Sequence, residues 1–163
     1  VENYSDMIRR ICLCHLKNAA DVEDVFQTVF LKYLLYKGTF ESAEHEKAWF
    51  VRVAINACKD HLKSLFRHGV LCLEDLADEA ASIAPEEHDV LDAVLSLPIK
   101  YKDAIYLHYY EGYSVAEIAK ILKITVNVVT ARLARARKKL KLEMEAVSDE
   151  GQGTLQTHRQ SEA

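Results

Sequence analysis

Hydrophobic residues recur at intervals of three and four along most of the chain, and no stretch alternates convincingly with a period of two. This spacing places apolar side chains on one face of a helix, so it predicts an all-α protein. The predicted helices cover residues 4–17, 21–37, 46–66, 85–97 and 98–111, followed by a helical pair within 114–141. Asp21 is the expected N-cap and Gly38 the expected C-cap of helix 21–37, and Gly112 is expected to close helix 98–111.

The pair within 114–141 has the pattern of a helix-turn-helix, a motif that places its second helix in the major groove of DNA. Ser114 and Glu117 have the spacing of a capping box, and Thr125 is placed to cap a second helix after a break at Lys123. The polar face of that helix offers groups for base edges and phosphates. The outer face carries Asn127, Thr130, Ala131 and Arg135, and it is flanked by Arg132, Arg137, Lys138, Lys139 and Lys141. A helical hairpin with a solvated basic face is the alternative.

Two other predicted helices each have, beside the apolar stripe that would pack in the core, a second face that could bind a partner. Helix 46–66 and the residue after it present a polar, cationic stripe at spacings of four, three, four and four, formed by Arg52, Asn56, Lys59, Lys63 and Arg67. Such a stripe can bind nucleic acid, or it can be an ordinary solvated face. The outer side of helix 21–37 carries Glu23, Gln27, Leu31 and Leu35. That side can serve a protein partner, or the helix can be buried on both sides.

Charge divides the chain into modules. The net charge is −4, but residues 68–99 hold eight acidic side chains and no Lys or Arg, while both flanks are basic. This pattern predicts two helical domains, 1–67 and 85–147, joined by a flexible acidic linker at 68–84. Acidic side chains in 74–92 are expected to compete with DNA for the basic groups. Residues 148–163 lack an apolar face and are predicted to be a disordered tail.

Composition excludes several classes of protein. No apolar run approaches the length of a membrane span, and no secretory signal is present, although Val1 indicates that an initiator Met is missing. Cys12 and Cys14 lie two apart on a predicted helix, so they diverge around its axis, and no second pair of metal ligands follows. The cysteines are therefore interpreted as buried free thiols in a reducing cytoplasm. No nucleophile with a paired base and no glycine-rich phosphate loop is visible, so an enzyme is not expected.

Several segments together resemble the extracytoplasmic-function (ECF) sigma factors, small two-domain initiation factors of bacterial transcription. The resemblance covers roughly residues 4–142. It is carried in the first domain by Asn18-x-x-Asp21-x-Glu23-Asp24-x-x-Gln27 with Val29-Phe30-Leu31-Lys32, and by Lys47-Ala-Trp49-Phe-x-Arg52-Val-Ala-x-Asn56-x-x-x-Asp60. In the second domain it is carried by Leu97-Pro98-x-Lys100-Tyr101, Tyr110-Glu111-Gly112-Tyr113-Ser114, Glu117-Ile118-Ala119 and Arg132-Leu133-x-Arg135-Ala136-Arg137.

The resemblance implies a function and three sets of contact residues. It implies a cytoplasmic factor that directs core RNA polymerase to promoters and helps to open them, with no cofactor and no metal. Polymerase (its β and β′ subunits) would be bound by Asp21, Glu23, Asp24, Gln27 and Leu31. The −10 element would be bound by Phe40, Trp49, Arg52, Asn56, Lys59 and Lys63. The −35 element would be bound by Lys100, Thr125, Asn127, Thr130, Arg132, Arg135 and Lys138. An anti-sigma factor is a further expected partner.

The chain departs from the family in its helix-turn-helix. Lys123 stands where the family has a glycine that tends toward positive φ, and Val128, Thr130 and Ala131 stand where it has Thr, Lys and Ser. These changes put the usual −35 contacts in doubt. Two alternatives stay open from the sequence: a stand-alone helix-turn-helix regulator whose first half dimerises or senses a signal, and a protein-interaction module with basic faces.

Overall fold

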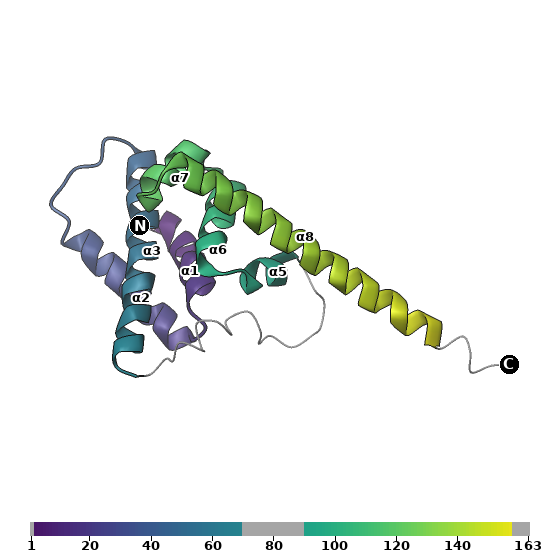
Figure 1. Cartoon of the computed structure of the whole chain (residues 1–163). Helices are drawn as coiled ribbons and strands as arrows, with labels where there is room; N and C mark the ends of the chain where they lie inside the picture. Colours follow the sequence, from purple (N-terminus) through teal and green to yellow (C-terminus); the bar gives the residue numbers. More distant parts are fainter. Residues whose placement is uncertain (1, 70–89, 158–163) are drawn as a thin grey trace.

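The computed structural model of the chain describes residues 2–69 and 90–157, and its side chains over 4–69 and 93–142. Every regular element in these ranges is a helix, which confirms the all-α prediction (Figure 1). The N-terminal half holds α1 (Glu2–His15), α2 (Ala19–Leu34) and α3 (Ala43–Arg67). The C-terminal half holds α5 (Val90–Ser96), α6 (Ile99–Ile105), the π-helix η1 (Tyr106–Tyr110), α7 (Val115–Leu122) and α8 (Val126–Thr157).

Each half has an apolar interior supplied by its helices. In the N-terminal half, α1, α2 and α3 pack on one another around buried side chains that include Ile8, Ile11, Val29, Phe50 and Ala54. In the C-terminal half, α6 and α7 pack on α8 around Leu107, Ile118, Val129, Leu133 and Ala136. The buried positions of α7 and α8 recur at the spacings that the sequence pattern predicts for one helical face.

Three helix ends in the N-terminal half differ from the sequence prediction. The helix expected at 21–37 begins at Ala19, because Asn18 has an extended backbone and its side chain accepts from the Ala20 N–H at 2.8 Å. It ends with Leu35 as the C-cap, so Asp21 and Gly38 are not its caps. The helix expected at 46–66 begins earlier, since the Ser42 hydroxyl accepts from the His45 N–H at 3.1 Å.

The helix expected at 98–111 is not a uniform α-helix. It starts after Pro98 as α6 and changes at Tyr106 into η1, a short π-helical segment. Gly112 follows with a φ of +74°, which glycine adopts without strain. The backbone therefore turns at Gly112, where the sequence predicts the end of the helix, and delivers Ser114 to the start of α7.

The helix-turn-helix has the local geometry that its sequence predicts. The Ser114 hydroxyl accepts from the Glu117 N–H at 3.3 Å, and the Glu117 carboxylate accepts from the Ser114 N–H at 2.8 Å, which completes the capping box. Thr125 caps α8 by accepting from the Val128 N–H at 3.3 Å. Lys123, between the two helices, has a φ of 54° and lies in the left-handed region. This is the conformation that favours glycine at this position.

Replacing Lys123 with Gly should raise the free energy of unfolding by about 1 kcal/mol, because a side chain in the left-handed conformation is strained. Thermal denaturation followed by circular dichroism measures the change. Lys120→Gly is the matched control: the same substitution at an exposed position inside α7 should lower stability by about 1 kcal/mol. Destabilisation by both substitutions would contradict the prediction.

Helix α8 is longer than the sequence indicates. The second helix of the pair continues without a break to Thr157, into the segment 148–163 for which the sequence predicts disorder, and it extends well beyond the helices that it packs on (Figure 1). The region from Lys138 to Lys141 contains mostly strong helix formers, which explains why the helix does not stop there. Residues 70–89, which hold most of the expected acidic linker, and residues 158–163 lie outside the described residues.

Candidate functional site

The outer face of α2 is exposed and partly apolar. Asp24 and Gln27 are exposed on it, and Leu31, Leu34 and Leu35 are 56%, 78% and 69% exposed. The opposite face buries Val22, Val25 and Val29, so the helix is buried on one side only. A leucine row that stays in contact with water is a surface that a protein partner can bury. Leu34 was not singled out in the sequence, although it follows Leu31 by three residues.

Two acidic residues of α2 form contacts with side chains of neighbouring helices. Asp21 lies 2.9 Å from Nε2 of His61, and Glu23 accepts from Arg9 at 3.0 Å. The hydrogen bond from Arg9 lowers the pKa of Glu23. Of the residues predicted to bind polymerase, Asp24, Gln27 and Leu31 therefore form the freely exposed set, while Asp21 and Glu23 also tie α2 to α3 and α1.

Aromatic side chains gather around an open hollow between the end of α2 and the start of α3. Phe40 stacks on Tyr36 at 5.0 Å between ring centroids and on Tyr33 at 6.1 Å, and Trp49 packs edge-on against it at 5.8 Å. Tyr33, Tyr36, Phe40 and Glu46 line the hollow. Glu46 accepts a hydrogen bond from the Tyr33 hydroxyl at 2.8 Å, which raises the pKa of Tyr33.

At this hollow, aromatic residues from two different elements meet. Phe40 belongs to the loop 35–42 and Trp49 to α3, yet their rings are in contact. Gly38 allows the Tyr36 ring to lie against the loop backbone. Flat rings beside an open hollow, with polar Thr39 and Ser42 on its wall, are suited to stacking a planar ligand such as an unpaired base.

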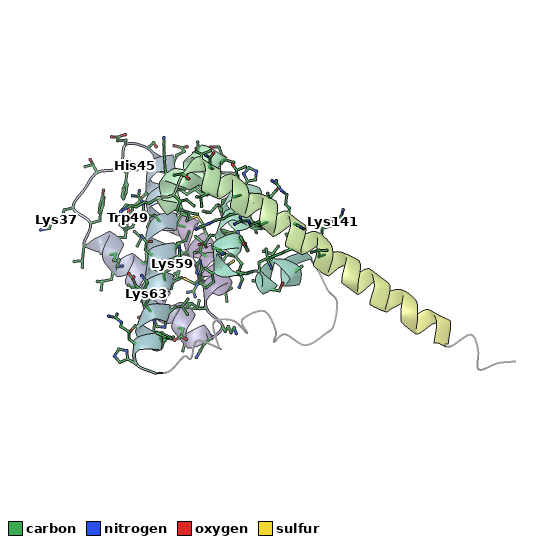
Figure 2. All side chains as sticks on the ribbon, in the orientation of Figure 1. Lys37, His45, Trp49, Lys59, Lys63 and Lys141 are labelled. Carbon is green, nitrogen blue, oxygen red and sulfur yellow. The ribbon has the colours of Figure 1, made fainter. Side chains whose placement is uncertain are left out.

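The cationic stripe continues from the hollow along α3. Figure 2 shows Trp49, Lys59 and Lys63 following one another on this helix. Asn56 and Lys63 are exposed, whereas Arg52 and Lys59 are half-buried. Lys59 lies 3.5 Å from the Asp103 carboxylate of α6. The cationic residues thus lie along α3 as the sequence predicts, but Lys59 is partly covered by the C-terminal half.

The helix-turn-helix presents a mixed outer face. Asn127, Arg135 and Lys138 are exposed on α8, and Lys100 is exposed on α6. Two predicted DNA-contacting hydroxyls are already used within the helix: Thr125 caps α8, and Thr130 donates to the Val126 carbonyl at 3.0 Å. Arg137 donates to the Tyr109 hydroxyl at 2.6 Å. Base contacts from this face would therefore depend on Asn127 and the arginines, with exposed Val128 beside them.

The cysteines form no metal site in the described part of the chain. Cys12 and Cys58 are buried, with the Sγ atoms 3.9 Å apart, while burial raises the pKa of half-buried Cys14 to about 11. No group of three or more His, Cys, Asp or Glu side chains with metal-binding geometry occurs among residues whose side chains are described. In the same residues, no helix has the length and apolar character needed to cross a membrane.

Comparison with known proteins assigns both halves to one family. The family model for Sigma-70 region 2 matches residues 1–67, and the model for Sigma-70 region 4 matches residues 87–140. The RNA polymerase sigma factor SigV of Bacillus subtilis (strain 168) is 29% identical over 139 residues, which span 83% of this chain and 82% of SigV. The ECF RNA polymerase sigma factor SigW of the same organism is 26% identical over 161 residues, 88% of this chain and 86% of SigW.

Two solved structures share the fold. The sigma factor RpoE of Bartonella quintana, crystallised with the anti-sigma factor NepR, matches with a TM-score of 0.61 at 20% identity, covering 86% of this chain and 91% of that chain. CnrH in complex with the cytosolic domain of CnrY matches with a TM-score of 0.59 at 20% identity, covering 90% and 85%. At this level of identity, the likeness concerns the fold.

Proposed function

The chain belongs to the ECF sigma factors of the sigma-70 family, and we propose a separate role in transcription initiation for each of its three candidate surfaces. As a sigma factor, it directs core RNA polymerase to promoters. In the proposed division, the outer face of α2 binds core polymerase, the aromatic hollow and the stripe of α3 bind the opened −10 element, and the helix-turn-helix reads the −35 element.

The observation that carries this division is the placement of the aromatic hollow at the head of the cationic stripe. Phe40 and Trp49 lie beside the start of α3, and Asn56, Lys59 and Lys63 follow along that helix. A single strand of DNA needs both features, because rings stack its bases while cations neutralise its phosphates. A duplex-binding helix alone would have no use for a stacking hollow.

The partners follow from the same role. We propose core RNA polymerase, promoter DNA and an anti-sigma factor as partners. The anti-sigma factor is proposed because RpoE was crystallised in complex with the anti-sigma factor NepR, and CnrH was solved in complex with the cytosolic domain of CnrY. We place the activity in the cytoplasm, where polymerase is found, and assign no catalysis to the chain itself. The stand-alone regulator and the pure interaction module are not favoured, because both halves match sigma regions.

A transcription assay tests the proposal. Core polymerase should start transcripts at a small, defined set of sites on host genomic DNA only when the chain is present, and sequencing of the transcript 5′ ends identifies the sites. Upstream of those starts, two shared elements should recur at a fixed spacing. Specific binding of the chain to DNA without polymerase, together with no effect on initiation, would instead identify a stand-alone regulator.

A further inference from the structure

The two halves of the chain are joined by a buried polar contact. His15, the last residue of α1, and Asp103 in α6 approach to 2.6 Å between Nε2 and Oδ1, with side chains 0% and 3% exposed. Beside them, Lys102 donates from Nζ to the Cys14 carbonyl at 3.2 Å. A buried carboxylate needs close polar partners to offset the loss of water. Asp103, from the C-terminal half, finds them in the N-terminal half.

Two carboxylates of the C-terminal half also form ion pairs with lysines of α3. Lys59 lies 3.5 Å from the second oxygen of Asp103, and Lys47 lies 2.9 Å from Glu111. The Glu111 side chain is only 8% exposed, and its other oxygen accepts from the Tyr106 hydroxyl at 2.7 Å. Lys47 also lies 5.5 Å from the centre of the Tyr113 ring. The contacts at Asp103 and Glu111 thus engage two lysines on α3, one near its start and one farther along it.

We propose that Asp103 and Glu111 act as internal substitutes for promoter phosphates, so that the closed chain and DNA compete for Lys47 and Lys59. This inference rests on the proposed role of α3 in binding the −10 element. A carboxylate and a phosphate present the same kind of anionic oxygen to a lysine ammonium, and an ion pair with one is lost when the other takes its place. Binding of the −10 strand along α3 therefore requires the C-terminal half to move away.

The closed arrangement leaves buried polar atoms of the contact without hydrogen bonds. Among the described residues, Nδ1 of His15 and Oδ2 of Asp103 are buried and have no hydrogen-bond partner, and Oδ2 has only the Lys59 ammonium 3.5 Å away. Unpaired buried polar atoms are a cost that opening removes. The ion pairs therefore stabilise closure and these two atoms oppose it, which fits a contact that a stronger ligand can displace. The acidic segment 74–92, for which the sequence also predicts competition with DNA, lies mostly outside the described residues, so that prediction stays a prediction.

A zero-length cross-link reports the closed state directly. A carbodiimide joins a lysine to a carboxylate only when the two are in contact, so the free full-length chain should give an amide between Lys47 and Glu111, detected by mass spectrometry. The cross-link should fall at least tenfold in a complex with core polymerase and promoter DNA. Persistence of the cross-link at full yield in that complex would overturn the proposal, as would its absence from the free chain.

Removing the two carboxylates tests the competition. The probe is a single-stranded −10 oligonucleotide taken from a promoter found in the transcription assay. The double variant Asp103→Asn with Glu111→Gln should bind this oligonucleotide about tenfold more tightly than the unmodified chain does. A tenfold change is what the loss of two partly screened ion pairs is expected to give. Asp6→Asn with Glu44→Gln is the matched control. It changes the net charge equally at two exposed carboxylates that pair with neither Lys47 nor Lys59 in the structure, and it should change affinity less than twofold.

Fluorescence anisotropy measures binding, and circular dichroism verifies that each variant is folded. If the double variant is unfolded, Glu111→Gln alone should give about a threefold gain. Equal affinity for the double variant and the unmodified chain, or an equal gain in the control, would overturn the inference. Failure of the proposed function is distinguishable, because the chain would then direct no promoter-selective transcription, while the cross-linking of the free chain would be unaffected.

Discussion

Replacing Leu31 and Leu35 with Asp is expected to weaken binding to core RNA polymerase by at least a hundredfold. Both side chains are more than half exposed, Leu31 on α2 and Leu35 at its C-cap, so the free chain loses little by the change. If polymerase buries them, each contributes about 1.5–3 kcal/mol, and the two together exceed the roughly 2.7 kcal/mol that corresponds to a hundredfold. Competition binding with labelled chain and purified core enzyme measures the effect.

The chain offers a closely matched control for this prediction. Leu13 on α1 and Leu142 on α8 are 58% and 56% exposed, and neither belongs to the outer face of α2. Their double replacement by Asp adds the same charge at similarly exposed leucines and should change polymerase affinity less than threefold. Equal loss in both double variants would show that added charge or lower stability causes the effect, and the assignment of polymerase docking to α2 would be wrong.

Phe40→Ala is expected to reduce formation of the open promoter complex by ten- to a hundredfold while leaving closed-complex binding nearly unchanged. Stacking of one base on an aromatic ring is worth about 1–3 kcal/mol, and only the unpaired strand provides such a base. Phe40 contacts the rings of Tyr33, Tyr36 and Trp49, so its removal takes one stacking ring from the hollow, while Trp49 still contacts Tyr33 and Tyr36. Permanganate footprinting of the −10 element measures opening, and gel mobility at low temperature measures closed binding.

Phe66→Ala serves as the control, since Phe66 is 43% exposed near the end of α3 and does not line the hollow. It should leave both complexes unchanged. Asn56→Ala and Lys63→Ala should also reduce opening more than closed binding, by smaller factors than Phe40→Ala. An equal loss of closed and open complexes in the Phe40 variant would make the hollow a structural cluster with no part in base capture.

The helix-turn-helix is the part of the chain that local signals describe best. Ser114, Glu117 and Thr125 make the caps that their spacing predicts, and Lys123 takes the left-handed conformation that the family resemblance led us to expect there. These contacts join residues three positions apart, so no distant partner decides between them. The Asn18 cap is just as local, but Asp21 gives an equally good sequence signal, and only the backbone conformation distinguishes the two. The Ser42 cap is local as well, but the sequence pattern places the start of that helix four residues later, at residue 46.

The sequence by itself determined the helical class, the order of the two halves and the composition of each candidate surface, because helical periodicity and capping depend on residues within a few positions of one another. The tertiary structure decided which of those residues are available. Asp21 and Glu23 are held by His61 and Arg9, and Phe40 meets Trp49. His15 meets Asp103 across 88 positions of sequence. Such contacts depend on how the helices pack, and no pattern along one helix records which face of another it will meet.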